Sequence, residues 1–286
     1  MFEHELVVLD QDHPGFRDAA YRARRDTIAR VARAYRDGSA VPDVPYTDDE
    51  HAVWRTVQES LAPLHARYAC SAYQRGAAML DLPRARIPQL AEVNRALAAR
   101  GGFSLVPVAG LVSPRVFMQE LFSQRFLSTQ YIRHHSRPLY TPEPDVIHEL
   151  VGHAPTLIEP AFIALNRAFG SATLATHDER AVTRLIRLYW YTLEFGAVEE
   201  AGQLRVFGAG LLSSFGELGR FEAAAELVPL DIGRVVETPF DPTSYQSTIF
   251  VAPSFDALSR TLLGYLADEK CADSNVSSGA AGDPRA

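Results

Sequence analysis

Two histidines, His148 and His153, stand five positions apart in the segment YTPEPDVIHELVGHAP. On a regular α-helix this spacing leaves the two side chains about 140° apart. In the zinc-protease pattern H-E-x-x-H the histidines are four apart, so that they share one helix face. His148 and His153 can therefore bind one metal ion only if their helix ends or widens. Gly152 lies between them and is suited to such a break.

A third ligand for this ion is needed, and Glu194 in LYWYTLEFGAV is the candidate. Its neighbours are mostly apolar, and a buried carboxylate without a partner costs several kcal/mol, so a positive group must face it. Two histidines and a carboxylate on one octahedral face leave positions open for dioxygen, substrate or water. An ion pair with Arg184 or Arg187 explains Glu194 equally well, and the residues alone do not decide between the two.

The rest of the chain predicts a mainly helical fold. Apolar residues recur at helical spacing in 16–37, and the run from Trp54 to Leu64 follows a capping box formed by Thr47 and Glu50. Further helices are expected at 87–100, 118–131, 160–169 and 178–195, and short strands at LRVFG and STIFVA. The segment FSLVPVAGLVSP indicates a strand that enters a loop, where Gly and Pro leave backbone groups available to a ligand.

The 286 residues contain no repeat and no linker before Asp268, which favours one compact domain over residues 1–270. The last sixteen residues, 271–286, hold one valine and no aromatic residue. Such a segment cannot bury enough apolar surface to offset its ordering entropy. We therefore expect a disordered C-terminal tail.

Composition excludes several classes of partner. The chain has 28 basic and 35 acidic residues, a net charge of −7, which disfavours nucleic acid and anionic membranes. Cys70 and Cys271 are too few for a disulfide framework or a Cys-rich zinc site. Neither a signal peptide nor a run of 18 apolar residues is present, so we expect a cytoplasmic protein.

Three motifs, YTPEPDVIHELVGHAP, YWYTLEFG and FGAGLLSSFGE, resemble those of the pterin-dependent aromatic amino acid hydroxylases in order and spacing. The likeness runs from about residue 16 to residue 266. Within the family the chain is most similar to the bacterial phenylalanine hydroxylases, because its length leaves no room for an N-terminal regulatory domain. Its tail also lacks a heptad-bearing tetramerisation helix, so a monomer is expected. The resemblance implies a single helical, basket-like catalytic domain with a few short β-strands.

The resemblance also assigns roles to individual residues. It makes His148, His153 and Glu194 the iron(II) ligands and brings Glu149 near the pterin through water, with a catalytic role; an ordinary surface carboxylate is the alternative for Glu149. The implied pterin site has Phe117 as the stacking ring, unless this ring only packs in the core, and includes Gly110, Val112 and Tyr189. The implied substrate site has Arg133 on the carboxylate, Thr141 and Ser213 completing that clamp, and Pro144, Trp190 and Phe195 around the ring.

Some residues fall outside this pattern. Many family members have a histidine at the place of Leu127 and a serine at that of Pro114. Leu127 removes a polar group from the neighbourhood of oxygen, pterin and substrate, which leaves pterin affinity and ring position open. Trp190 and Phe195 also fit a role as core aromatics. The remaining histidines His134, His135 and His177 are interpreted as ordinary loop residues, not as ligands.

The implied activity is an iron(II)- and tetrahydropterin-dependent monooxygenase, with tetrahydrobiopterin or a related pterin, that uses O2 to convert L-phenylalanine to L-tyrosine. The same chemistry on another ring, as in tryptophan 5-hydroxylation or phenylalanine 3-hydroxylation, is the alternative. Two remoter alternatives are a zinc peptidase with Glu149 as general base and a metal-binding module without turnover. The five-residue histidine spacing disfavours the peptidase. The natural pterin and the metabolic pathway are left open.

Overall fold

The computed structural model describes residues 9–278, with side chains up to Glu269. Its N-terminal part is helical as predicted, and Asp18 and Thr47 cap the first two helices. The predicted capping box is confirmed, because Thr47 accepts from the Glu50 backbone and Glu50 accepts from that of Thr47. The helices in this part are α1 Ala19–Ala34, α2 Asp48–Tyr68, α3 Ser71–Leu80 and α4 Leu90–Ala98.

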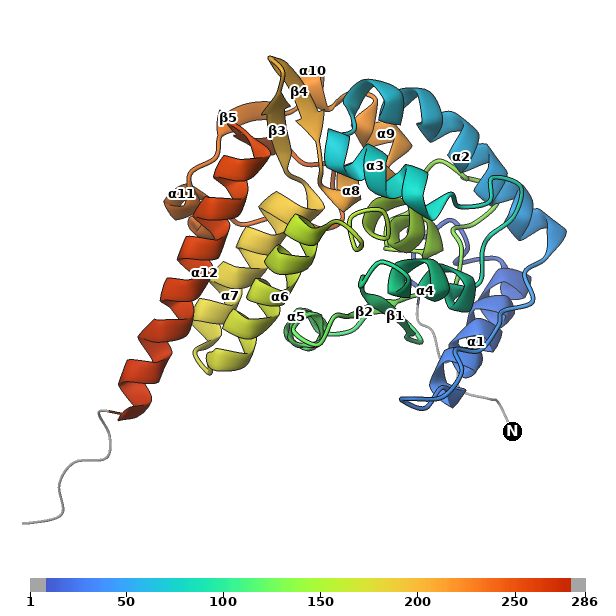
Figure 1. Ribbon diagram of the computed structural model, residues 1–286. Coiled ribbons are helices and arrows are strands. Elements are labelled where there is room, and N and C mark those ends of the chain that lie inside the picture. Colours follow the sequence, from blue (N-terminus) through green and yellow to red (C-terminus); the bar gives the residue numbers. More distant parts are fainter. Residues whose placement is uncertain (1–8, 279–286) are drawn as a thin grey trace, which may run out of the picture.

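The C-terminal part is built around three long helices, α6 Pro160–Ala175, α7 Glu179–Tyr189 and α12 Phe255–Ser278, which lie side by side (Figure 1). Helix α12 is anchored by buried Leu258, Leu262 and Leu266. This helix continues to Ser278, so the domain boundary predicted after residue 270 falls inside it. The physical reason is that a helix already anchored by packing extends at a low free-energy cost per added residue. Residues 279–286 of the predicted tail lie outside the described residues. The shorter helices are α5 Pro114–Leu121, α8 Ala209–Ser213, α9 Phe215–Leu218, α10 Phe221–Ala224 and α11 Ile232–Glu237.

The strands are short and form two sheets. Strands β1 Ser104–Pro107 and β2 Arg125–Ser128 pair in parallel. The second sheet has the order β4-β3-β6-β5 and contains β3 Ala197–Glu200, β4 Gln203–Val206, β5 Glu226–Pro229 and β6 Thr248–Ala252. The helix predicted at 118–131 is wrong beyond Leu121. Gln124 adopts a left-handed backbone (φ 54°), which ends the helical path before β2 pairs with β1.

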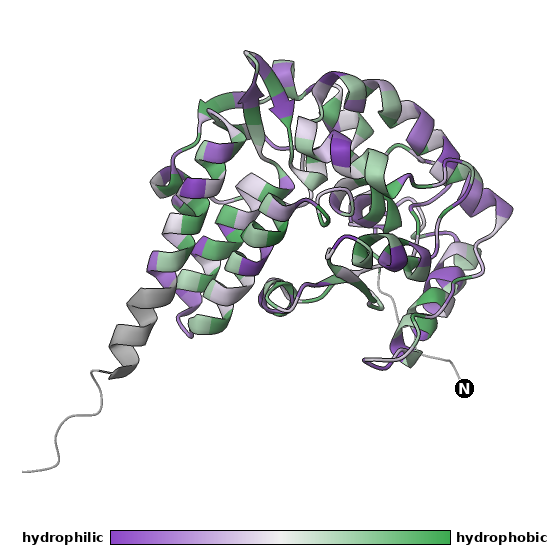
Figure 2. Cartoon of the chain, in the orientation of Figure 1, coloured by the Kyte–Doolittle hydropathy of each residue, from purple (hydrophilic) through white to green (hydrophobic). Residues whose placement is uncertain are grey.

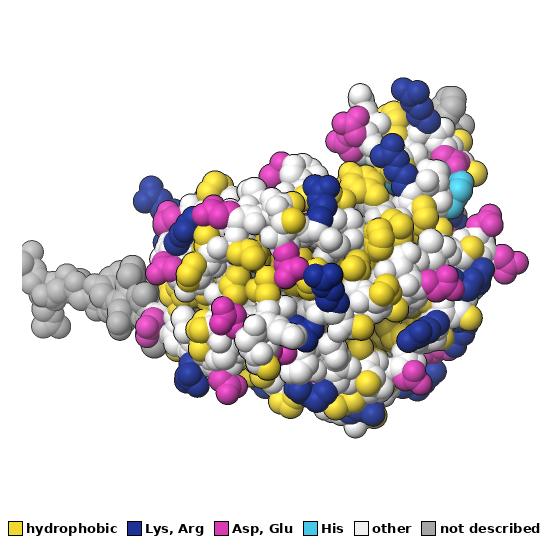
Figure 3. Space-filling model, turned by 90° about the horizontal axis from the view of Figure 1, so that it is seen from above, with side chains coloured by type: hydrophobic (Ala, Val, Ile, Leu, Met, Phe, Trp, Pro, Cys, Tyr) yellow, Lys and Arg dark blue, Asp and Glu magenta, His cyan; other side chains and the backbone are white. Residues whose placement is uncertain are grey.

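One hydrophobic core runs through both parts of the chain, from Trp54 and Leu61 in α2 to Leu258 and Leu262 in α12. Figure 2 shows hydrophobic and hydrophilic residues alternating along the helices. On the face in Figure 3, basic and acidic side chains are interspersed. Within the described residues no helix is both long and apolar enough to cross a bilayer. The prediction of a mainly α fold with a few short strands is confirmed.

Gly76 in α3 tests how closely the helices pack. A Cβ at this position lies 1.7 Å from the carbonyl oxygen of Pro155, a backbone atom, whereas at Gly264 in α12 it meets nothing within 4 Å. We expect Gly76→Ala to lower the free energy of unfolding by about 1–3 kcal/mol or more through overpacking. Gly264→Ala, the matched control, should leave it unchanged or raise it by up to about 1 kcal/mol. Urea denaturation of both variants measures the difference, and equal stabilities would contradict the packing shown.

Candidate active site

Two segments of π-helix carry the predicted metal ligands. They are η1 His148–His153 and η2 Trp190–Glu194, in which hydrogen bonds reach back five residues: Ala154 N donates to the Glu149 carbonyl (3.0 Å) and Phe195 N to the Trp190 carbonyl (2.9 Å). With about 4.4 residues per turn, a separation of five residues leaves two side chains about 50° apart. The widening expected from the histidine spacing is confirmed, and His148 and His153 now face the same side.

Gly152 has a different role from the one expected. Its backbone is not left-handed, and it does not end the helix. A Cβ there would lie 2.7 Å from the carbonyl oxygen of Ala209, which is the first residue of α8. Gly208 is similarly confined, with the Glu194 carbonyl oxygen 2.5 Å from the position of a Cβ. These glycines let α8 approach η1 and η2 closely, which brings Ser213 beside His148.

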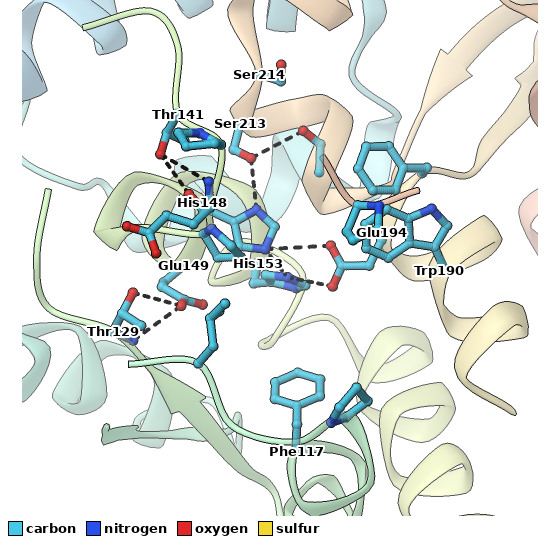
Figure 4. Close-up of a pocket in the computed structure, with 18 of the residues that line it drawn as sticks. Phe117, Thr129, Thr141, His148, Glu149, His153, Trp190, Glu194, Ser213 and Ser214 are labelled. Atoms are coloured by element: carbon cyan, nitrogen blue, oxygen red, sulfur yellow. Dashed lines mark hydrogen bonds and ion pairs between the residues drawn. The ribbon is translucent and has the colours of Figure 1, made fainter. Parts of the chain in front are cut away.

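The side chains of His148, His153 and Glu194 converge on one point (Figure 4). The two Nε2 atoms are 3.1 Å apart, and the carboxylate oxygens of Glu194 lie 3.1 Å from His153 Nε2 and 3.6 Å from His148 Nε2. Ligand atoms about 2.1 Å from an ion in adjacent octahedral positions are separated by about 3 Å. Both the distances and the donor set of two nitrogens and one carboxylate fit iron(II).

Burial sets the charge state of these groups. It lowers the pKa of His148 to about 4, so this imidazole is neutral, as a metal ligand must be. Burial would raise the pKa of Glu194, but His153 outweighs it and the pKa lies below its usual value. For His153 burial lowers the pKa and the Glu194 carboxylate raises it, with a net increase. Glu194 is thus held as a carboxylate by the two imidazoles.

The alternative partners of Glu194 are engaged elsewhere. Arg184 pairs with Glu269 of α12 at 3.1 Å, and Arg187 Nη1 donates to the Val236 carbonyl. The interpretation of Glu194 as half of an arginine ion pair is therefore wrong. Its partners in the structure are the two histidines that would hold the metal with it.

Glu149, the residue after the first histidine, is also buried, which contradicts the surface-carboxylate alternative. Its Oε1 accepts hydrogen bonds from Thr129 N (3.2 Å) and Thr129 Oγ1 (3.0 Å). Burial raises the pKa of Glu149 to about 7. A carboxyl group with such a pKa can take up or give up a proton near neutral pH at the edge of the cavity.

Arg133 lines the same cavity and is fixed by a buried ion pair. Its Nε and Nη2 donate to the two oxygens of Asp145 at 2.9 and 2.8 Å, and its backbone N donates to Asp145 as well (2.8 Å). Asp145 is fully buried and also accepts from His148 N (3.2 Å). The guanidinium is thereby held in one orientation at the start of η1, and Nη1 is not part of this fork.

Two hydroxyls predicted to complete the clamp with Arg133 already have hydrogen-bond partners within the protein. Ser213 Oγ donates to the Ala209 carbonyl (2.8 Å) and lies 3.0 Å from His148 Nδ1. Thr141 Oγ1 donates to the Glu143 carbonyl (2.8 Å). A hydroxyl has one proton to donate, so neither can give it to a substrate carboxylate while these bonds persist. Ser213 instead orients His148, and with Nδ1 protonated the Nε2 of that ring is directed at the metal position.

An aromatic wall adjoins Glu194. The Trp190 indole stacks on Phe240 (ring centroids 4.2 Å apart, interplanar angle 12°) and lies beside Phe195 (4.7 Å). Trp190 Nε1 donates to Gln246 Oε1, and Gln246 N donates to Glu217. Pro144 also lines the cavity. The three residues predicted for the ring pocket are thus all in the cavity wall.

The residues predicted to hold a pterin occupy another side of the cavity. Gly110 and Val112 lie in the loop between β1 and α5, and both line the cavity. Phe117 projects toward the metal position (Figure 4) and packs edge-to-face on Phe126 and Tyr189. Tyr189 is more buried than expected of a contact residue, and its hydroxyl donates to Asn166. An aromatic ring beside an irregular backbone fits a flat heterocycle with polar edges.

The two departures from the family pattern have distinct environments. Leu127 is nearly buried and lines the cavity, so its apolar side chain does face the reaction space. Pro114 is the first residue of α5, directly after the N-cap Ser113. Proline is favoured at this position because its missing N–H would have no partner there. His177 is exposed and is not among the residues that line the cavity.

Sequence reasoning missed three polar residues of the cavity region. Asp145 precedes η1 in the quoted motif and could have been predicted as a helix-capping acid. Glu217 lies in FGAGLLSSFGE, is buried, and has its pKa raised by burial to about 7. Thr129 gave no signal, since its contact with Glu149 joins segments twenty positions apart.

Comparison with known proteins agrees with this arrangement. The sequence profile of the biopterin-dependent aromatic amino acid hydroxylases matches residues 2–271. The chain is 44% identical over 260 residues to the chloroplastic phenylalanine 4-monooxygenase of Chlamydomonas reinhardtii, covering 91% of this chain and 72% of that protein. It is 42% identical over 272 residues to human tyrosine 3-monooxygenase, covering 92% of this chain and 51% of the human one.

Solved structures give the same result. The phenylalanine hydroxylase of Chromobacterium violaceum with bound iron(III) and 7,8-dihydrobiopterin is 34% identical, with a TM-score of 0.72, covering 78% of this chain and 82% of that one. Iron and a biopterin are thus the cofactors found with this fold. The chain belongs to the family of biopterin-dependent aromatic amino acid hydroxylases, which are iron-dependent monooxygenases.

Proposed function

We propose that this protein hydroxylates L-phenylalanine to L-tyrosine with iron(II), a tetrahydropterin and O2. The observation that carries the proposal is a cavity of about 520 Å³ onto which the two histidines, Glu194 and an aromatic wall all open. Trp190, Phe195 and Phe240 line this cavity and pack on one another, which narrows the space left for the ring of a substrate. This favours a single six-membered ring as substrate.

In this proposal His148, His153 and Glu194 hold iron(II), which together with the reduced pterin activates O2 for transfer of one oxygen atom to the ring. Arg133 binds the carboxylate of the amino acid, and its fork on Asp145 keeps the guanidinium oriented before substrate arrives. Trp190, Phe195 and Pro144 enclose the ring and exclude water. Phe117 stacks on the pterin, with Gly110 and Val112 supplying backbone hydrogen bonds.

Glu149 is proposed to handle a proton at the pterin side. Thr129 holds one of its oxygens, so the carboxyl group has a fixed orientation. Its raised pKa, about 7, lets it hold a proton or release it without a large free-energy cost near neutral pH. A catalytic role for Glu149 is consistent with both features. The monomeric state and the cytoplasmic location stay predictions.

One assay separates this proposal from its alternatives. The recombinant protein is given iron(II), tetrahydrobiopterin and each of phenylalanine, tyrosine and tryptophan, and the products are identified by retention time. We expect the highest kcat/KM for phenylalanine, with tyrosine as product. Preference for tyrosine or tryptophan, or a 3-hydroxylated product, would overturn the substrate assignment. Peptide hydrolysis by the zinc-loaded protein would instead support the zinc-peptidase alternative. Iron binding without any turnover would support the alternative of a metal-binding module.

The metal ligands give a first prediction. His148→Ala, His153→Ala and Glu194→Ala should each lose stoichiometric iron and hydroxylation, because two remaining protein donors hold a labile divalent ion poorly. Circular dichroism should show that each variant folds. His177→Ala, an exposed histidine, is the control and should keep both iron and activity. Normal iron content in Glu194→Ala would remove Glu194 from the metal site.

Arg133→Lys tests the substrate carboxylate site. An ammonium cannot reproduce a planar two-bond grip, and charged hydrogen bonds of this kind contribute about 1.5–3 kcal/mol, so we expect KM for phenylalanine to rise about 10- to 100-fold. Iron content should not change. Arg184→Lys alters an arginine on the outer side of α7 and serves as the control. An unchanged KM in Arg133→Lys would show that another group binds the carboxylate.

Trp190→Phe tests the size of the ring pocket. The change removes part of the indole and its hydrogen bond to Gln246. Because a small change in an apolar pocket is worth about 1–3 kcal/mol, the tryptophan-to-phenylalanine ratio of kcat/KM should rise by about one to two decades. Competition assays with both amino acids measure the ratio. If it does not move, Trp190 is core packing and does not select the substrate.

A further inference from the structure

A second group of metal-type donors lies outside the active-site cavity. Among the described residues, Asp18, His134 and His135 have ligand atoms that all lie within 4.8 Å of one another. Asp18 is the N-cap of α1, and the two histidines directly follow Arg133. The group therefore joins the N-terminal helix to the segment that holds the substrate-binding arginine. The proposed hydroxylation does not use it.

Two of the three donors already have the separation that a metal requires. His134 Nε2 lies 3.2 Å from Asp18 Oδ2. Two ligand atoms that are each 2.0–2.1 Å from a tetrahedral ion lie about 3.3 Å apart. Without an ion, the same distance allows a hydrogen bond between the two groups. An ion can therefore replace the shared proton with little movement of either side chain.

The His134 ring is held as metal-binding imidazoles usually are. It is 6% exposed and packs edge-to-face on Tyr21, with ring centroids 4.9 Å apart. Its Nδ1 accepts from the backbone N–H of Ser136 (3.2 Å) and lies 2.7 Å from Ser136 Oγ. Without a metal, Nε2 therefore carries the proton and donates it to Asp18. With a metal on Nε2, the proton is on Nδ1 and can be donated to the Ser136 hydroxyl, a supporting contact of the kind that metal-binding histidines have.

His135 supplies the third donor from the solvent side. Its ring lies beside that of His134, with centroids 4.2 Å apart and an interplanar angle of 33°. The side chain is exposed, so it can rotate by the small distance that ligation needs. The fourth position of a tetrahedral ion then faces solvent and takes a water molecule.

An adjoining hollow of about 210 Å³ gives an ion access to two of the three donors. Asp18 and His135 line it, together with Asp49 and Glu50 of α2. Two arginines also line it, but both are paired: Arg24 with Glu50 and Arg133 with Asp145. The acidic groups Asp18 and Asp49 are therefore not outweighed by these cations, and they raise the local concentration of a cation.

We propose that Asp18, His134 and His135 form a second metal site, for a divalent transition ion such as Zn²⁺. Two imidazoles and one carboxylate are the donors that Zn²⁺ prefers, whereas Mg²⁺ and Ca²⁺ require oxygen ligands. Arg133 lines both the hollow and the active-site cavity. If the proposed function holds, an ion bound next to Arg133 restrains its segment and changes KM for the amino acid, while iron remains bound.

Zinc binding tests the site directly. Equilibrium dialysis is done with the full chain carrying His148→Ala and His153→Ala, in which the first metal site is disabled. We expect one Zn²⁺ per chain, no competition from excess Mg²⁺, and binding at least ten-fold weaker after addition of His135→Ala. His177→Ala in the same background should bind as the parent does. No zinc in the parent, or equal affinity after His135→Ala, would overturn the site.

A second measurement uses the iron-loaded, otherwise unmodified protein, in case the double variant does not fold. The zinc bound per chain is measured while iron stays in place. As in the first experiment, we expect zinc binding to be at least ten-fold weaker in His135→Ala. The KM for phenylalanine is then measured with and without Zn²⁺. If Zn²⁺ changes this KM in the unmodified protein but not in His135→Ala, the coupling through Arg133 is supported. If KM in the unmodified protein is the same with and without Zn²⁺, the coupling is overturned. Zinc binding without any hydroxylation of phenylalanine would support the second metal site and contradict the proposed function.

Discussion

The buried carboxylate of Glu194 sets the condition that the rest of the site satisfies. A charge in such a position is tolerated only beside positive or metal-bound groups. Within the described residues, its ion-pair partners are the imidazoles of His148 and His153 rather than an arginine. Both must reach the same point, and five residues of regular α-helix would keep them apart. The chain meets this condition with two π-helical segments, one for the histidines and one that ends at Glu194.

The same segments connect the three candidate metal ligands to the residues proposed to bind the substrate. Asp145 joins Arg133 to the start of η1, because it accepts from the guanidinium and from the backbone of His148. Ser213 joins α8 to His148, which the closeness of Gly152 to Ala209 makes geometrically feasible. A shift of either ligand segment would therefore disturb several contacts at once. We infer that this coupling keeps ligand and substrate geometry fixed relative to each other.

The two proposed metal positions differ in their physical character. The active-site donors are largely buried, with side chains 5–14% exposed, and their pKa values are moved by burial and by each other. In the second group only His134 is nearly buried, while His135 is exposed and Asp18 also serves as the cap of α1. A preformed pair with one mobile donor binds an ion reversibly and at lower affinity than a fully preorganised site. Such a position is suited to modulation and not to holding a permanent cofactor.

The sequence by itself determined the helical class, the capping box of α2, and the ligand candidates, because periodicity, caps and motif spacing are local properties. It also showed that His148 and His153 can share one ion only if their helix ends or widens between them. It could not find β2, whose pairing with β1 is a contact between distant segments, nor the bond from Thr129 to Glu149. Tertiary structure alone decided that Arg184 and Arg187 pair with groups other than Glu194, and that the Ser213 hydroxyl lies beside His148. Each of these depends on which donors meet which acceptors after packing, and a residue's type does not contain that information.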